Sequence, residues 1–243
     1  MDPWNYDPAR DLEKPMIERL RHFPREPDIL VYGLRLSAAF LVRFWLRLYH
    51  RLSIRGLENL PAEGSFVMVA NHSSHLDVLC LLAALPWSRL HRTFPAAAQD
   101  YFFVNAPRVF LAAVAVNAMP FNRHSNPCHS LDLCRQVLDN AGNALILFPE
   151  GTRSTTGELG EFKPGVGLVV AGTTYPVLPC YVEGAHRAWP KGAWIPRPTK
   201  VRLHIGPPRQ YPHLEPCKEA AVQIAGELRE AVVALSEHTD PSR

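Results

Sequence analysis

FVMVANHSSHLD, residues 66–77, combines a strand, a polar turn and the start of a helix. The five apolar residues 66–70 predict a buried β-strand. The polar residues 71–74 follow, and their types favour turns and helix N-caps. Leu76 then opens an apolar run of helical length. The sequence therefore predicts that His72 lies at the carboxyl end of a strand and just before a helix, the edge at which α/β sheets bind ligands.

The spacing of His72 and Asp77 restricts how the two side chains can meet. Five residues on one regular helix turn through about 500°, which leaves the side chains roughly 140° apart. We therefore expect His72 in the turn and Asp77 in the first helical turn, from where the carboxylate can reach back to the imidazole. A carboxylate on one ring nitrogen fixes the tautomer and raises the basicity of the other nitrogen. Such a pair can take a proton from an incoming hydroxyl.

Other interpretations of this stretch remain open at this point. A histidine at a strand end is commonly a capped or surface residue. His72, His75 and Asp77 could also bind a metal ion, as in a metal-dependent hydrolase. Zinc sites need three or four ligands of compatible spacing, and no further His/Cys cluster is evident in the sequence, so we expect no metal. A catalytically silent lipid-binding protein is a third interpretation.

Composition and charge narrow the class of protein. The chain has 243 residues and a net charge of +3, and we expect no nucleic-acid partner. The five cysteines form no CxxC pair, which predicts free thiols in a reducing compartment. The charged N-terminus does not resemble a signal peptide. We also expect no stretch long enough to span a bilayer.

Residues 29–52 have a helical pattern with an unusual charge distribution. There is no acidic residue between Asp28 and Glu58. Arginines at 43, 47, 51 and 55 repeat every four residues and predict a basic stripe, with aromatic and apolar residues on the other side. This pattern is typical of an amphipathic helix in an anionic membrane interface, although a helix packed on the protein's own core would also fit. We expect residues 1–51 to form a membrane-associating helical segment and residues 52–243 to form the main domain.

The rest of the chain alternates between strands and helices, which predicts an α/β fold. Residues 109–116 are expected to form a buried helix or a surface that contacts lipid tails. Residues 52–64 are expected to form a strand, a turn and a loop. The other expected strands are 66–70, 92–97, 144–148, 177–182 and 200–206, and the expected helices after residue 66 include 130–143 and 216–238.

A second polar turn, FPEGTRS at residues 148–154, follows the expected strand at 144–148. Gly151 can adopt a positive φ, which would let successive backbone N–H groups converge on an anion. Arg153 adds a fork of donors suited to phosphate or carboxylate. Arg123 and Lys163 are further cations on flanking loops. The two turns together suggest a base near a hydroxyl substrate that bears a phosphate.

These motifs resemble those of the glycerophospholipid acyltransferase superfamily, most closely the bacterial 1-acylglycerol-3-phosphate acyltransferases. The family's NHxxxxD block is matched by Asn71, His72 and Asp77, and FPEGTRS is matched in full at 148–154. A strand with a central proline is matched around Pro179. In the remaining block Asn117 stands where the family usually has glycine.

The resemblance implies a fold and a reaction. The expected fold is a mixed, largely parallel sheet flanked by helices, with an N-terminal amphipathic membrane-interface helix and an acyltransferase domain at 52–243. His72 would be the general base and Asp77 its orienting partner, while the residues implied to hold the acceptor are Arg123, Glu150, Gly151, Thr152 and Arg153. The acyl donor would be acyl-CoA or acyl-carrier protein, with no other cofactor.

The resemblance also implies a substrate and a location. The expected acceptor is a lysophospholipid, first of all 1-acylglycerol-3-phosphate, with lyso-ornithine lipid as an alternative. The expected location is the cytoplasmic face of the cell membrane, as a peripheral or monotopic protein.

Overall fold

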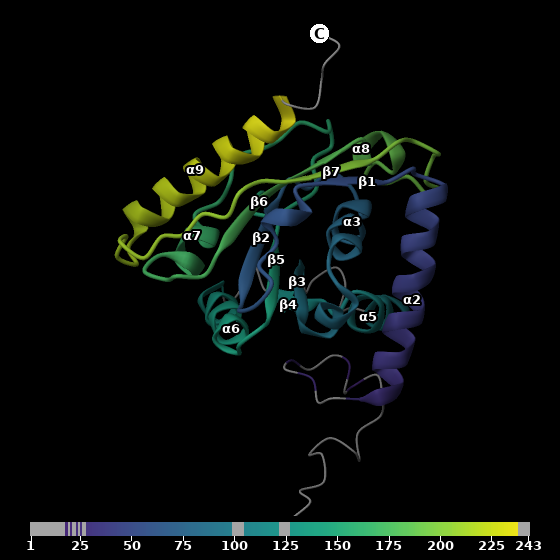
Figure 1. Ribbon diagram of the computed structural model, residues 1–243, viewed down its shortest axis with the longest axis horizontal. Coiled ribbons are helices and arrows are strands. Elements are labelled where there is room, and N and C mark those ends of the chain that lie inside the picture. The colour runs from purple at the N-terminus through teal and green to yellow at the C-terminus, as the bar shows by residue number, and fades with distance from the viewer. Residues whose placement is uncertain are drawn as a thin grey trace, which may run out of the picture.

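The computed structural model describes residues 18, 20, 23, 25, 28–98, 105–121 and 127–237. Within them a seven-stranded sheet has the order β1-β7-β6-β2-β5-β3-β4 (Figure 1). The strands from β6 to β4 are parallel to one another, whereas β7 pairs antiparallel with β6 and parallel with β1. The predicted mixed, largely parallel sheet is thus confirmed. The strands are β1 Ser53–Arg55, β2 Phe66–Ala70, β3 Thr93–Ala98, β4 Met119–Phe121, β5 Ala144–Leu147, β6 Val177–Glu183 and β7 Arg202–Ile205.

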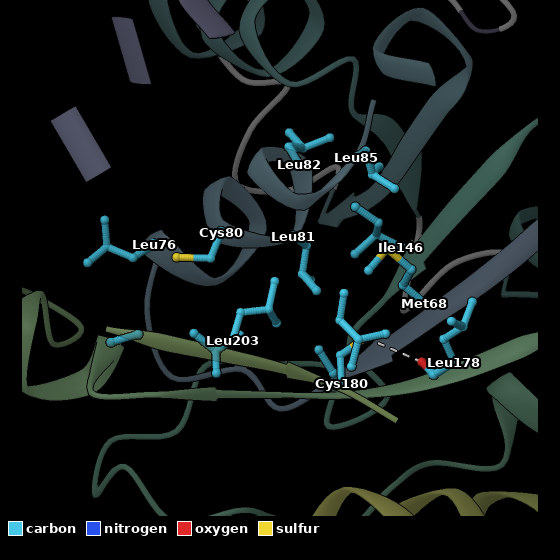
Figure 2. Close-up of a cluster of buried hydrophobic side chains, with 14 of the residues drawn as sticks. Met68, Leu76, Cys80, Leu81, Leu82, Leu85, Ile146, Leu178, Cys180 and Leu203 are labelled. Atoms are coloured by element: carbon cyan, nitrogen blue, oxygen red, sulfur yellow. Dashed lines mark hydrogen bonds between the residues drawn. The ribbon is translucent and has the colours of Figure 1, made fainter. Parts of the chain in front are cut away.

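Helices cover both faces of the sheet and make a three-layer arrangement (Figure 1). Every residue of β2 is buried, because successive side chains point into opposite layers. Met68 packs into a cluster with α3 (Figure 2), whereas Val67 and Val69 pack into a cluster with α6, α7 and α9. One layer consists of α2 Ile29–Leu48, α3 Leu76–Ala84 and α8 Ala185–Ala188, and the other consists of α6 Pro127–Asp139, α7 Gly165–Val170 and α9 Lys218–Glu237.

Helix α5, Ala106–Phe110, runs on into a π-helical turn, Leu111–Ala115, and this turn contacts α2. Val109 and Ala113 are buried beside Val31 of α2. Phe110 and Leu111 are exposed. This segment therefore has both a buried face and an apolar outer face. The remaining short helices are η1 Leu57–Asn59 and η2 Trp87–Arg92.

The predicted basic stripe on the N-terminal helix is wrong. Helix α2 ends at Leu48, so Arg51 lies beyond it and Arg55 belongs to β1. Arg43 is turned towards the protein, where its guanidinium donates to the carbonyls of Leu82 and Leu85 at the end of α3. The exposed residues of α2 are instead mostly apolar: Ile29, Leu30, Leu34, Leu36, Phe40, Leu41, Phe44 and Leu48. Ser37 and Arg47 are the exposed polar side chains of the helix.

The length of α2 corrects a second expectation. The helix has 20 residues and, by length and composition alone, is apolar enough to cross a membrane. Arginines at 35, 43 and 47 interrupt the apolar run in the sequence, but the fold buries Arg35 and turns Arg43 inward. The division of the chain at residue 51 stays a prediction.

Candidate active site

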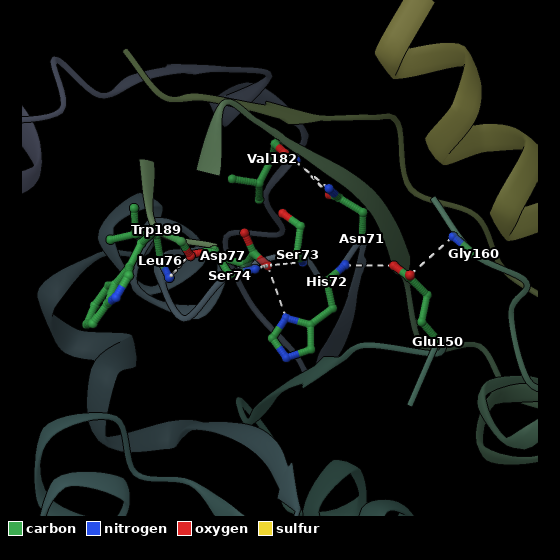
Figure 3. A network of polar contacts seen from close by, with 10 residues as sticks. All are labelled: Asn71, His72, Ser73, Ser74, Leu76, Asp77, Glu150, Gly160, Val182 and Trp189. Carbon is green, nitrogen blue, oxygen red and sulfur yellow. Dashed lines mark hydrogen bonds and ion pairs between the residues drawn. The ribbon is translucent and has the colours of Figure 1, made fainter. Parts of the chain in front are cut away.

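The turn after β2 is anchored to the neighbouring strand β6 by a buried asparagine. Asn71 Nδ2 donates to the Val182 carbonyl at 3.1 Å, and the Val182 N–H donates to Asn71 Oδ1 at 2.8 Å. The two bonds extend the β2–β6 pairing, whose last matched residues are Ala70 and Cys180. The side chain therefore holds the start of the turn against the sheet (Figure 3).

One carboxylate oxygen of Asp77 organises the next three residues. Oδ2 accepts from His72 Nδ1 at 3.0 Å, from the Ser73 N–H at 2.6 Å and from the Ser74 N–H at 2.8 Å (Figure 3). The Asp77 side chain is fully buried, whereas that of His72 is 21% exposed. Because the carboxylate accepts, His72 Nδ1 carries the proton and Nε2 keeps its lone pair. The contact that the spacing of His72 and Asp77 predicts is present, and Nε2 points away from Asp77 (Figure 3).

The second turn holds the main chain and the ring of His72. Glu150 Oε1 accepts the His72 N–H at 2.7 Å, and the Ser154 N–H donates to the His72 carbonyl at 2.7 Å. The Phe148 ring stacks on the imidazole with centroids 4.1 Å apart. The two motifs that the sequence separates by more than 70 residues thus form one site.

Both carboxylate oxygens of Glu150 are bonded to backbone. Oε2 accepts the Gly160 N–H at 3.1 Å, while Oε1 faces His72 (Figure 3). Burial raises the pKa of Glu150, and the two N–H donors oppose that shift. The family resemblance assigns Glu150 to the acceptor, but its contacts in the structure are with the turn that carries His72 and with the loop at Gly160.

The turn at Gly151 has the backbone that the sequence predicts. Gly151 has a φ of +74°, and a Cβ there would lie 2.9 Å from Lys163 Nζ. Its N–H donates to the Phe148 carbonyl at 3.0 Å. Since the N–H groups of Gly151 and Ser154 already bond to carbonyls, these two groups do not contribute to the expected anion cradle, and a contribution from the rest of the turn stays a prediction.

Arg153 lies at the same edge of the sheet as the two histidines of the first turn. Burial lowers the pKa of His75 to about 4, and the charge of Arg153 and then that of His72 add to this effect. Thr152 is exposed beside Arg153. Arg123, the other predicted cation for the acceptor, lies outside the described residues.

The two remaining family blocks have clear structural roles. Asn117, where glycine is expected, has a φ of +55°, and asparagine is one of the few residues that tolerate this conformation. Its Nδ2 also donates to the carbonyls of His91 and Thr93, both at 3.1 Å. Pro179 lies in β6, and its carbonyl accepts the Gly206 N–H at 2.8 Å.

Sequence reasoning missed the contacts that tie the turn to the chain after α8. Ser74 Oγ donates to the Trp189 carbonyl at 2.7 Å, and the His75 ring meets the Trp189 ring edge-on at 5.8 Å. In the sequence, the only indication of the Ser74 contact is that a serine stands just before the start of a helix. Among the described residues, no group of three or more His, Cys, Asp or Glu side chains could hold a metal ion.

Comparisons with known proteins agree with this architecture. A family model described as Acyltransferase matches residues 51–183. The chloroplastic 1-acyl-sn-glycerol-3-phosphate acyltransferase of Arabidopsis thaliana is 31% identical over 195 residues, which are 76% of this chain and 52% of the relative. The corresponding Pseudomonas aeruginosa enzyme is 28% identical over 160 residues, 65% of this chain and 58% of the relative. The chain thus spans about half the length of the curated relatives it matches.

A solved structure extends the similarity to the fold. The crystal structure of the 1-acyl-sn-glycerophosphate (LPA) acyltransferase from Thermotoga maritima aligns with a TM-score of 0.62 and 25% identity. The alignment covers 88% of this chain and 81% of that one.

Proposed function

The chain belongs to the acyltransferase family, and we propose that it transfers a fatty acyl group from a thioester donor to the free hydroxyl of a lysophospholipid. The observation that carries this proposal is the three-way bonding of Asp77 Oδ2, which holds His72 in the tautomer of a general base. The names of the relatives favour 1-acylglycerol-3-phosphate as the acceptor, which would give phosphatidic acid.

In the proposed reaction His72 Nε2 takes the proton of the acceptor hydroxyl while the hydroxyl oxygen attacks the thioester carbonyl. The C–O bond forms, the C–S bond then breaks, and the departing thiolate takes the proton from His72. Asp77 stabilises the imidazolium that exists between the two steps. These steps need a base but no metal or redox cofactor, and acyl-CoA or acyl-carrier protein supplies the acyl group.

We propose that Arg153 binds the phosphate of the acceptor, together with Arg123 and with Thr152 of the same turn, whose backbone shape Gly151 sets. Arg153 supports this role by its position, since its charge acts on His75 next to the catalytic turn. A guanidinium presents paired donors that match phosphate oxygens. The contact between Arg153 and the phosphate of the lysolipid would then hold the hydroxyl of the same lysolipid near His72.

We further propose that the protein is a monotopic or peripheral protein of the cytoplasmic membrane face. Eight large apolar side chains of α2, from Ile29 to Leu48, are exposed, and the exposed Phe110 and Leu111 lie on the segment that packs against this helix. A large group of exposed apolar side chains such as this one indicates a surface that binds a protein partner or a membrane. Both the acceptor and the product of the proposed reaction are membrane lipids, which favours the membrane.

Mass spectrometry of the diacyl product tests the proposed reaction. Purified protein would be given a panel of lysolipids, including 1-acylglycerol-3-phosphate and lyso-ornithine lipid, with either acyl-CoA or acyl-carrier protein as donor. We expect product from one acceptor and a fall of at least about 10²-fold in His72→Ala. His213→Ala, which changes an exposed histidine outside the site, is the matched control and should retain the activity. A wild-type rate in His72→Ala would contradict the mechanism.

A further inference from the structure

The chain after α8 presents two bulky apolar side chains to solvent. Trp194 is 95% exposed and Ile195 is 77% exposed. The loop that carries them is closed at its base, where the Arg197 N–H donates to the Ala188 carbonyl at 2.7 Å. Within the loop, Trp189 Nε1 donates to the Ala193 carbonyl at 2.8 Å. The fold thus holds residues 189–197, here called the tryptophan loop, in a defined shape with its apolar residues outward.

The charge around the tryptophan loop has one sign. No aspartate or glutamate occurs between residues 184 and 214. Four basic residues in or next to the loop are exposed: Arg187, Lys191, Arg197 and Lys200. Exposed tryptophan among basic side chains is the composition of surfaces that enter the interface of anionic membranes, where the ring lies among the headgroups.

The tryptophan loop also adjoins the end of α2 (Figure 1). Tyr49 OH, directly after α2, donates to the Pro196 carbonyl at 3.0 Å. His50 Nδ1 donates to the Thr199 carbonyl at 3.2 Å, and the Val201 N–H donates to the His50 carbonyl at 3.0 Å. The exposed apolar residues of α2 extend to Leu48, so the loop is fixed next to the end of this apolar surface.

We propose that Trp194 and Ile195 insert into the interfacial layer of an anionic lipid bilayer, so that the tryptophan loop and the outer face of α2 contact the same membrane surface. This inference rests on the membrane association proposed above. Trp189, at the base of the loop, accepts the bond from Ser74. The loop therefore links the membrane surface to the turn that carries His72, at a fixed distance from the layer in which a lysolipid resides.

Vesicle co-sedimentation tests the insertion. Vesicles of phosphatidylcholine with phosphatidylglycerol would be compared with vesicles of phosphatidylcholine alone. We expect W194S/I195S to weaken binding to the mixed vesicles by at least about tenfold, because the substitutions remove the two apolar side chains that the bilayer would bury. K191Q/R197Q should weaken it about fivefold per charge and leave binding to phosphatidylcholine vesicles unchanged. V222S changes an exposed apolar residue of α9, on the other side of the sheet, and should bind as wild type.

Fluorescence gives a second readout that does not depend on affinity. Brominated lipids should quench the wild-type protein more than W194F, which keeps an aromatic ring and should still bind vesicles. Wild-type binding by W194S/I195S, or equal quenching of wild type and W194F, would overturn the proposal. If W194S/I195S lost binding to acyl-carrier protein while its vesicle binding stayed at the wild-type level, the proposal would also be overturned, and the loop would be assigned to a protein partner instead.

Detergent-dispersed lysolipid separates this inference from the proposed function. W194S/I195S should form product at the wild-type rate in detergent, because the catalytic turn is unchanged and no bilayer is needed. Product in detergent with equal vesicle binding by both proteins refutes the insertion alone. Absence of product in both proteins, with membrane binding as expected, refutes the acyltransferase reaction alone.

Discussion

Glu150→Gln tests whether a buried carboxylate positions His72. Both oxygens of Glu150 accept backbone N–H groups, from His72 at 2.7 Å and from Gly160 at 3.1 Å. Glutamine keeps one acceptor oxygen, but its NH₂ group would face the other N–H and cannot accept from it. One buried donor is then left without a partner, which costs about 1–3 kcal/mol. We expect the free energy of unfolding to fall by this amount.

The same substitution should reduce kcat more than it changes KM for the acceptor. The lost bond frees either the His72 main chain or the loop that supports it, and misplacing a catalytic group by about 1 Å can cost about 10²-fold in rate. We expect kcat to fall by about 10- to 100-fold. Initial rates of diacyl product at varied acceptor concentration, together with urea unfolding, measure both effects.

Glu161→Gln is the matched control. Glu161 is 89% exposed and its only described ion pair, with Arg229, has an N···O distance of 3.6 Å. Exposed pairs contribute at most about 1 kcal/mol, so kcat should be unchanged. A wild-type kcat in Glu150→Gln would refute the positioning role. A loss seen only as a raised acceptor KM would instead make Glu150 a direct ligand of the acceptor.

Three further predictions follow from the site. Asn117→Ala should cost about 2–4 kcal/mol in urea unfolding, because alanine is strained at a φ of +55° and two hydrogen bonds are lost; Asn117→Gly, which relieves the strain, should cost less. His75 has a lowered pKa of about 4, so it binds its proton more weakly in the folded state, and stability falls as pH drops from 6.5 towards 4. Between pH 7.5 and pH 5 the wild type should lose about 2 kcal/mol more than His75→Gln, as measured by urea unfolding at both pH values; equal losses would contradict this. Arg153→Ala should raise the acceptor KM by about tenfold or more with a smaller change in kcat, and an unchanged KM would exclude the phosphate role.

The features that the sequence predicted well are local. The five apolar residues of β2 are all buried, as their unbroken run requires. His72 and Asp77 are five residues apart, and only the arrangement with one residue in the turn brings them into contact. In both cases the information lies within one short stretch, so no knowledge of distant residues is needed.

The basic stripe failed because periodicity does not encode where a helix stops. Arg51 has a φ of +46° and Ser53 already begins β1, so the period of four runs past the helix end. Arg43 lies on the helix as expected, but its guanidinium bonds the carbonyls at the end of α3 and covers the Trp87 ring at 4.0 Å. These partners lie about 40 residues away, and nothing in the local pattern distinguishes such an arginine from one in solvent.

The contact between His72 and Glu150 could have been predicted if the register of strands β2 and β5 had been known. The register of the parallel strands pairs Val69 of β2 with Leu147 of β5. His72 and Glu150 each lie three residues beyond this pair, so equal offsets along parallel strands bring them together at the same edge. A shift of one residue in this register would move every side chain of a strand to the opposite face and would separate the carboxylate from the His72 N–H. The geometry of the turn that carries His72 is therefore fixed by the burial of Val69 and Leu147 in one core cluster, and the polar site depends on apolar packing between the two strands.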